Sequence, residues 1–448
     1  MFFGMNRTFP AVAAMAAALV CISAWAQDAP ATLPKGPLSI EACVTTALGQ
    51  SPVELSAQLS TESAAHSANA AKAPYYPALG FNLAASRWQR RIFLPNGLSF
   101  PGQPVPTIVG PTDDYSFSFG ATYTLFDGGE RKAQLAAARA QQQKTVADAA
   151  KTKQDLVLGV HQAFNSLASA QAQFDVAQKS LARSEDHLRL ARLRKEAGTV
   201  PLVDVTRAES EAASAKLSLI RAENAVRINR GRLATAMGLP ASTSLDISPS
   251  VPLPEPPDEA QLQEADRRAQ KDRPALLAAA QGVEAARQAV NLAHSSFSPK
   301  VSAAASYGRE DASWYPQDQT WLVGVNVSIP IFTGFSRKEN LARAKVDLAK
   351  TETDARQATL VVREQVWDAF SGVQAAYQAI RTAETLVASA RESERLAKAR
   401  YESGAGTISD LLDAETTLAR AEASQVAADW DYRSALAQFR WSYGDLTF

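Results

Sequence analysis

The 448-residue sequence has almost no cysteine, and its charges balance. Only Cys21 and Cys43 occur, so no framework of disulfides is available. Lys and Arg number 46 together, as do Asp and Glu. A net charge of zero argues against nucleic-acid binding through bulk electrostatics. Beyond residue 26 no apolar run approaches the roughly 20 residues of a membrane-spanning helix, which excludes a bundle of membrane helices but not every kind of membrane protein.

The sequence also lacks the residue patterns that enzymes and metalloproteins use. It contains no nucleophile elbow, no phosphate-binding loop and no cluster of metal ligands. Its histidines are isolated on predicted helices, where solvated or packed side chains are the simpler interpretation. These absences predict a protein that is not an enzyme and that uses neither a metal nor a cofactor. The histidines are His66, His161, His187 and His294.

Residues 1–26 have the features of an export signal. Arg7 is their only charge; an uncharged apolar stretch follows it, and small residues lead up to Ala26. This order is typical of a cleaved secretory signal, so we place the cleavage between Ala26 and Gln27. Lipidation of Cys21 is the weaker alternative, because the valine before it does not suit a lipidation motif.

The rest of the chain is an internal duplication. Matching residues lie 222 positions apart near the start and 206 apart further on, which places one insertion in residues 92–111. This insertion is rich in proline and glycine and predicts an irregular loop. We predict a first repeat over 27–238, a proline-rich connector over 239–257 and a second repeat over 258–448. The 206-residue offset relates 125–128 to 331–334, Gly198 to Gly404, Asp204 to Asp410, and Glu209 to Glu415.

Each repeat contains two runs in which apolar and small polar residues alternate. The stronger runs cover 115–125 and 321–329, and the weaker ones 79–85 and 301–307. Alternation predicts β-strands with one apolar face, about as long as the 9–11 residues of a tilted membrane strand. A soluble sheet is the alternative, but the predicted helices use their apolar stripes on each other and leave little to cover that face. Four strands cannot close a barrel, so several chains must share one.

Long helices follow each strand pair. Apolar residues recur every seven positions from Val160 to Leu188 and again from Val366 to Val387, with alanines between them. This spacing is typical of coiled-coil packing. The predicted helix over 130–197 is about twice as long as its return helix over 202–237. A further helix over 53–73 fills the remaining height, so each repeat supplies two columns of one helical wall.

This ordered, duplicated set of features resembles the TolC family of outer-membrane efflux and secretion channels. The resemblance is carried by the strand pairs, by residues 125–129 and 331–335, and by two helical tips over 195–204 and 401–414. It implies a mainly α fold with membrane β-strands, in which each protomer has long antiparallel coiled-coil helices and four strands. It further implies a homotrimer that forms a 12-strand β-barrel and a 12-helix α-barrel.

The resemblance also implies a location and a function. The barrel would lie in the outer membrane of a Gram-negative bacterium, surrounded by lipid, with the helical tunnel in the periplasm. The chain would be the passive exit duct of a tripartite efflux system for small molecules, with a periplasmic adaptor and an inner-membrane transporter as partners. An outer-membrane channel for one-step (type I) protein secretion is the alternative within this architecture. A free-standing porin and a periplasmic coiled-coil scaffold are alternatives from other classes.

The family pattern assigns gate residues at the tips. Asp410 and Asp413 are three positions apart and share a helix face. The resemblance places them on the lumen side of the periplasmic mouth, where three copies give two rings of carboxylates. Such rings attract cations, which predicts a cation-selective mouth that divalent ions plug. Helix capping and the helix dipole are the alternative for these aspartates, and it fits Asp204, a further gate position, better.

The tips also carry a predicted latch and a predicted docking surface. Tyr401 matches a tyrosine that latches the closed tip in some relatives, but Gly406 stands where those relatives have an arginine. The latch is therefore reduced or uses Arg400 or Arg194. In the family these turns meet the adaptor, although turn glycines without a partner are the alternative. The predicted docking residues are Gly198, Thr199 and Val200 of the first tip and Gly404, Ala405 and Gly406 of the second.

Overall fold

The computed structural model describes most of the chain after the predicted export signal. The signal itself, with its cleavage between Ala26 and Gln27, lies outside the described residues. So does most of the predicted loop over 92–111. The described residues are 36–88, 92–93, 108–109, 113–248 and 253–445.

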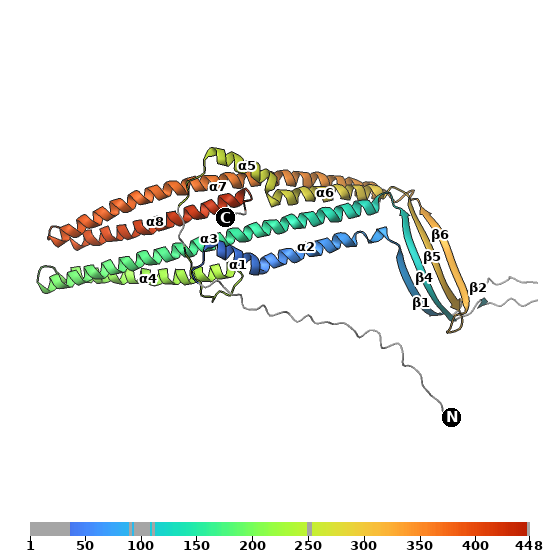
Figure 1. The fold of residues 1–448 in the computed structure, drawn as a ribbon, viewed down its shortest axis with the longest axis horizontal. Helices are drawn as coiled ribbons and strands as arrows, with labels where there is room; N and C mark the ends of the chain where they lie inside the picture. The colour runs from blue at the N-terminus through green and yellow to red at the C-terminus, as the bar shows by residue number, and fades with distance from the viewer. Residues whose placement is uncertain (1–35, 89–91, 94–107, 110–112, 249–252, 446–448) are drawn as a thin grey trace, which may run out of the picture. The chain divides into compact units, whose positions relative to one another are not determined.

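Each half contains helices, then strands, then a long helix and a return helix, in the same order, as the duplication predicts (Figure 1). The first half contains α1 (Ile40–Gln50), α2 (Pro52–Ala70), the 3-10 turn η1 (Ala73–Tyr75), β1 (Ala78–Arg87), β2 (Ile92–Phe93), β3 (Ile108–Val109), β4 (Asp113–Phe126), α3 (Glu130–Glu196) and α4 (Leu202–Ala236). The second half contains α5 (Glu259–Asp272), α6 (Pro274–Ser295), β5 (Lys300–Asp311), β6 (Asp318–Ser328), α7 (Ser336–Glu402) and α8 (Ile408–Ser442).

The four predicted strands form one antiparallel sheet in the order β1-β4-β5-β6. Phe81 pairs with Phe119 across β1 and β4, and Tyr307 pairs with Trp321 across β5 and β6. The prediction that the insertion is wholly irregular is wrong at its ends, where β2 and β3 pair with each other. Both short segments consist of β-branched and aromatic residues, which favour extended pairing.

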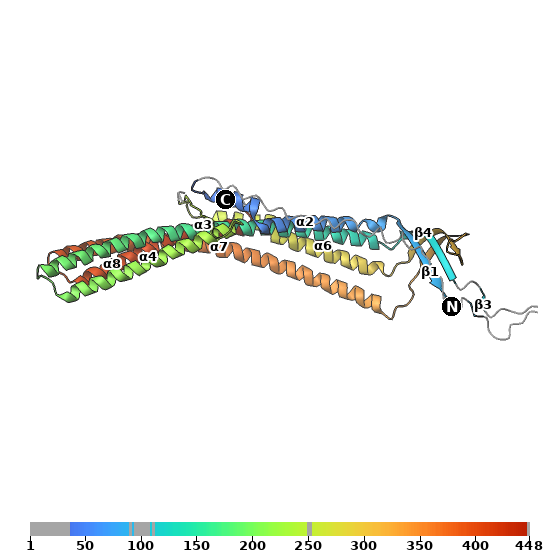
Figure 2. The same cartoon turned by 90° about the horizontal axis from the view of Figure 1, so that it is seen from below.

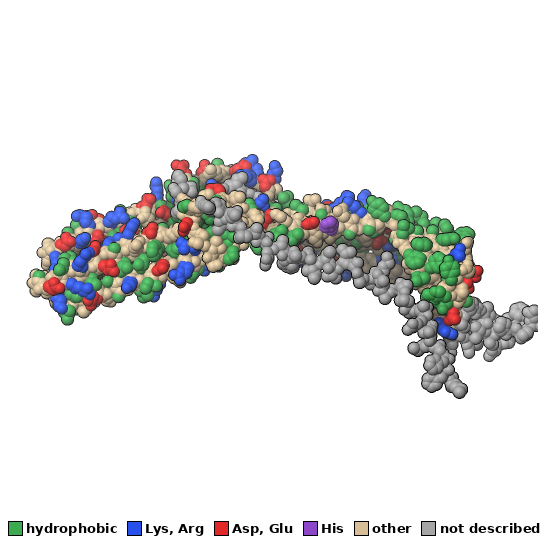
Figure 3. Space-filling model, turned by 60° about the horizontal axis from the view of Figure 1, so that its bottom comes forward, with side chains coloured by type: hydrophobic (Ala, Val, Ile, Leu, Met, Phe, Trp, Pro, Cys, Tyr) green, Lys and Arg blue, Asp and Glu red, His purple; other side chains and the backbone are tan. Residues whose placement is uncertain are grey.

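One face of the sheet is apolar and exposed. Leu79, Phe81, Trp321 and Val323 have exposed fractions of 81%, 56%, 74% and 75%, and hydrophobic side chains gather over the strands in Figure 3. Phe81 and Phe119 stack on this face with their ring centroids 4.8 Å apart. The predicted apolar face therefore exists, and it remains uncovered in a single chain. An exposed apolar area of this kind marks an interaction surface.

The helices lie side by side in two rows that follow one another along the length of the molecule, and the long helices α3 and α7 belong to both rows (Figures 1 and 2). Near the sheet the order is α2, α3, α6, α7, and beyond the middle of the long helices it is α4, α3, α8, α7. The predicted seven-residue spacing is confirmed where it forms the core: Val160, Leu167, Val366 and Val373 are all buried. Among the helices that the structure describes, none is apolar enough over a sufficient length to cross a membrane.

An arginine fixes the junction between the first strand pair and its long helix. The Arg131 Nε donates to the Asp127 carboxylate at 2.7 Å, and the guanidinium also donates to the Pro74 carbonyl at 3.3 Å. It lies 5.2 Å from the centroid of the Tyr75 ring. Asp127 is only 7% exposed, so this ion pair is largely removed from water.

The second half repeats this junction with a neutral partner. Arg337, which corresponds to Arg131, donates to the Thr333 hydroxyl at 3.0 Å and to the Ser296 carbonyl at 3.2 Å. It lies 5.7 Å from the centroid of the Phe297 ring. These three contacts correspond in the two halves although the carboxylate has become a hydroxyl, so the duplication extends to individual hydrogen bonds.

A pair of glycines ends the return helices in corresponding places. Gly238 follows α4 with φ +80, and Gly444 follows α8 with φ +86. A side chain at Gly238 would come within 2.8 Å of the Gln50 carbonyl oxygen, and one at Gly444 within 3.7 Å of the Asp272 carbonyl oxygen. The left-handed backbone favours glycine at both positions, and the close approach of the chain adds to this at Gly238. Each return helix thereby ends against the start of its own repeat.

The two junction arginines make a matched pair for a stability experiment. Arg131→Met leaves Asp127 buried without its counter-charge, whereas Arg337→Met removes only hydrogen bonds to neutral groups. We expect Arg131→Met to lower the free energy of unfolding by about 1–3 kcal/mol more than Arg337→Met. Urea denaturation followed by circular dichroism measures the difference. Equal losses in the two variants would contradict this account of the junction.

Candidate functional site

The candidate site is the pair of helical tips, where each long helix turns into its return helix. Gly198 (φ +71) and Gly404 (φ +77) adopt the left-handed conformation at corresponding places. The Thr199 amide donates to the Arg194 carbonyl at 2.9 Å, and the Ala405 amide donates to the Arg400 carbonyl at 2.9 Å. Both tips thus close with the same glycine-dependent helix ending.

The predicted docking residues lie on the surface of these turns. Gly198, Thr199, Gly404 and Ala405 are exposed, and Val200 and Gly406 are partly exposed. The two turns are therefore available to a partner from the same end of the helices. Their role in docking remains a prediction.

Asp410 completes a capping box with Thr407, the residue that caps the start of α8. Its carboxylate accepts hydrogen bonds from the Thr407 amide at 3.1 Å and from the Thr407 hydroxyl at 2.8 Å, while the Asp410 amide donates to that hydroxyl at 3.2 Å. These hydrogen bonds hold the pKa of Asp410 below its usual value. The carboxylate is ionised, exposed and fixed in direction. Asp413 follows one turn later and is also exposed.

The expectation for Asp204 is wrong in its capping part, although Asp204 lies in the first turn of α4, where the helix dipole favours a carboxylate. The first tip has Pro201 at the cap position, and no side chain accepts a hydrogen bond there. Proline has no side-chain acceptor, whereas Thr407 at the corresponding position of the second tip has a hydroxyl. The Asp204 amide donates instead to the Pro201 carbonyl at 3.1 Å.

Tyr401 is buried, and an arginine from the first tip holds it. The tyrosine is 2% exposed and packs against Ile408 and Leu411 of α8. The Arg194 guanidinium lies 4.7 Å from the centroid of the Tyr401 ring. It donates to the Tyr401 carbonyl at 2.7 Å and to the Glu402 carbonyl at 2.6 Å. We call this contact the tip latch.

The tip latch resolves an open alternative in the sequence. With glycine at 406, either Arg400 or Arg194 could serve the tyrosine, and the structure brings Arg194 to it. A cation at the last carbonyls of α7 also complements the negative end of that helix. Burial raises the pKa of the Tyr401 hydroxyl although Arg194 opposes this, so the tyrosine stays neutral.

A second contact between the tips was not predicted. Arg207 of α4 donates to the Ser409 hydroxyl of α8 at 2.6 Å. The two residues are 202 positions apart, and neither belongs to a recognisable motif. Only the packing of the hairpins brings them together.

The tip latch makes a local prediction. Arg194→Gln removes the stacked cation and weakens the hydrogen bonds to the end of α7. We expect a local loss of about 1 kcal/mol, which makes the amides of residues 401–406 exchange roughly fivefold faster. Hydrogen exchange with mass spectrometry measures the rate. Arg192→Gln is the control, because Arg192 pairs with exposed Glu209 inside the first hairpin; equal acceleration in the control would contradict the latch.

Comparison with known proteins agrees with this architecture. The family model for outer membrane efflux proteins matches residues 44–239 and 267–445. Protein CyaE of Bordetella pertussis is 25% identical over 350 residues, which cover 77% of this chain and 71% of the relative. Outer membrane protein TolC of Vibrio cholerae is 24% identical over 305 residues, which cover 66% of this chain and 69% of the relative.

A solved structure shows the same fold. The outer membrane protein VceC of Vibrio cholerae superposes with a TM-score of 0.77 at 20% identity, covering 90% of this chain and 96% of VceC. The predicted fold class is confirmed. Because the family model matches both repeats over most of their length, the chain belongs to the outer membrane efflux protein family.

Proposed function

We propose that this chain forms the outer-membrane exit duct of a tripartite efflux assembly, through which small molecules leave the periplasm passively. The observation that carries the proposal is an exposed apolar sheet joined directly to long, water-exposed helices in one chain. The sheet face suits lipid, and the helices suit an aqueous tunnel. The family itself is one of outer-membrane efflux proteins. The proposed partners are a periplasmic adaptor, which would meet the exposed tip turns, and an inner-membrane transporter.

The open edges of the chain support assembly into a closed ring. In the sheet, β1 and β6 each have only one neighbour. Among the described helices near the sheet, α2 and α7 are the outer members of their row. In the sheet and in the helical row, the first and last elements thus each lack a neighbour on their outer side. These two open sides face in opposite directions, which is the arrangement of a head-to-tail interface. Three copies would close a 12-strand barrel with no unpaired strand edge. A sheet in lipid needs this closure because lipid offers no hydrogen bonds to an open edge.

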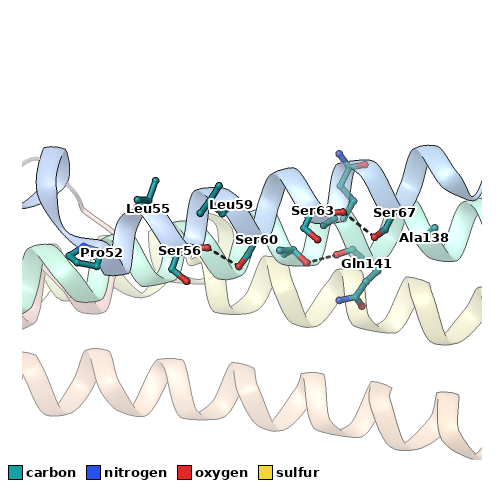
Figure 4. A pocket seen from close by; sticks show the side chains of 12 residues that line it. Pro52, Leu55, Ser56, Leu59, Ser60, Ser63, Ser67, Ala138 and Gln141 are labelled. Atoms are coloured by element: carbon teal, nitrogen blue, oxygen red, sulfur yellow. Dashed lines mark hydrogen bonds between the residues drawn. The ribbon is translucent and has the colours of Figure 1, made fainter. Parts of the chain in front are cut away.

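A groove beside α2 marks one side of this proposed interface (Figure 4). It is open, has a volume of about 830 Å³, and lies between α2 and α3. Leu55 and Leu59 on successive turns of α2 are 57% and 55% exposed. On the opposite side of the chain, α7 exposes Val346 and Leu360. We propose that α7 of a second copy covers the α2 groove.

Charge in the α2 groove should prevent assembly. The double variant Leu55→Arg, Leu59→Arg places two cations where the second copy would bury apolar surface. We expect the trimer to dissociate largely into monomers, since burying an unpaired charge costs several kcal/mol. Light scattering of the protein in detergent measures the mass. Leu253→Arg, in the connector, is the control and should remain trimeric; a trimeric double variant would refute the proposed interface.

The gate is proposed at the second tip. Asp410 and Asp413 are exposed on one face of α8, and the cap fixes Asp410. In a threefold ring they would form two circles of carboxylates at the periplasmic mouth, with Asp204 nearby on the first tip and the Arg194–Tyr401 latch behind them. A ring of ionised carboxylates concentrates cations and binds divalent ions.

Removing the charges tests the gate without removing the cap. Thr407 caps α8 and is unchanged in Asp410→Asn, Asp413→Asn, and the amide oxygen of an asparagine at 410 can still accept the hydrogen bond from the Thr407 amide. We expect the channel to lose most of its preference for cations and its block by millimolar Mg²⁺. Single-channel recording in planar bilayers measures both. Asp354→Asn, an exposed aspartate of α7 paired with Lys350, is the control. Unchanged selectivity and block in the double variant would refute the gate.

A further inference from the structure

A buried carboxylate joins the two hairpins, α3–α4 and α7–α8, behind the tips. Glu415 of α8 is 1% exposed, although its repeat partner Glu209 is an exposed residue of α4. The Glu415 Oε2 lies 3.3 Å from Nε2 of His187 on α3, and His187 is 3% exposed. The Glu415 Oε1 accepts a hydrogen bond from the Ser184 hydroxyl at 3.3 Å. The duplication has thus placed the same residue type in water in one half and between hairpins in the other.

No neighbouring charge neutralises this pair alone. Arg183 is 3.8 Å from Glu415 but only 3.0 Å from Glu422, so its charge is shared. Arg391 of α7 lies 3.6 Å from Glu422. A buried group that keeps a net charge is strongly disfavoured. The remaining titratable groups that face the pair come from α4 and α7, and they are Glu211, Glu394, Lys398 and Glu402.

The surroundings favour one proton in the pair. Burial raises the pKa of Glu415 to about 7, although Arg183 and the Ser184 hydrogen bond oppose this. Burial lowers the pKa of His187 from 6.5, and Lys398 and Arg183 add to the effect. Both shifts favour the neutral forms, a protonated Glu415 beside a neutral His187. In mildly acidic solution the buried pair therefore holds one proton and no net charge.

We propose that the Glu415–His187 pair acts as a one-proton lock that keeps the contact between the hairpins insensitive to acidification of the periplasm. The role of this lock rests on the proposed gate. When the gate opens, the hairpins separate and both side chains become exposed to water. The carboxyl then releases its proton and the imidazole binds one. Between about pH 6.5, where a solvated imidazole titrates, and the lowered pKa of the buried His187, both states hold one proton, so their equilibrium does not change with pH.

Substituting either member should unbalance the lock in opposite directions. Glu415→Gln keeps the neutral shape but has no proton to release. Separation then takes up a proton on His187, and the ratio of separated to joined hairpins rises up to about tenfold per unit as pH falls from 6.5 toward the lowered pKa of the buried imidazole. In His187→Gln, separation must release the proton of Glu415. The ratio then falls up to about tenfold per unit between about pH 7 and 4.5.

Spin labels on the two return helices can report this ratio in the full-length protein. Ser210→Cys on α4 and Thr417→Cys on α8 are exposed positions. Cys21→Ala and Cys43→Ala remove the two cysteines of the sequence, so that only the introduced thiols carry labels. Pulsed electron resonance between pH 4.5 and 7.5 gives the populations of short and long distances. Glu209→Gln is the matched control, since its carboxylate is the exposed repeat partner of Glu415.

The expected result is a flat profile for the parent protein and the control from about pH 6.5 down to the lowered pKa of the buried His187, with slopes of opposite sign for the two lock variants. Parallel profiles in all four proteins would overturn the proposal, as would a parent profile that itself changes about tenfold per pH unit. A single distance at every pH in every variant would also overturn it, because the pair would then not lie at a moving contact. Cation selectivity, recorded separately, tests the proposed gate, so failure of the lock and failure of the gate remain distinguishable.

Discussion

Unpaired backbone groups along β1 and β6 constrain everything else in this chain. The strand pairs of the two repeats meet in one sheet, but that sheet ends in two open edges, and lipid offers no hydrogen bonds to satisfy them. The apolar face of the same sheet is also uncovered. A chain with these features is complete only when other copies close its edges. The helices next to these strands, α2 before β1 and α7 after β6, also lack a neighbour on their outer sides.

Duplication explains how one chain builds its sheet and its helical rows from a few kinds of contact, each used twice. The same arginine contacts hold both strand–helix junctions, and the same left-handed glycines end both return helices. The differences between the halves are as informative. Thr407 replaces Pro201 and gives the second tip a true cap, which fixes Asp410. Glu415 replaces an exposed glutamate and carries a polar group into the packing between hairpins.

Much of the fold followed from periodicity. Alternation located the four strands, the seven-residue spacing located the long helices, and the repeat offset located the insertion. The tips were found through resemblance, and the docking and gating roles of their residues stay predictions. The contacts between the hairpins were harder to foresee. Arg194 was one of two candidates for Tyr401, while Arg207–Ser409 and Glu415–His187 were not anticipated, because each joins residues more than two hundred positions apart.

The sequence by itself determined the elements, their order and their duplication, because hydrophobic period and turn residues act locally along the chain. It also determined the apolar sheet face, since alternation requires one. Only the tertiary structure decided which arginine holds the tyrosine and which glutamate is buried. Those outcomes depend on how the two hairpins pack side by side, and residues with identical local sequence roles acquire different solvation there.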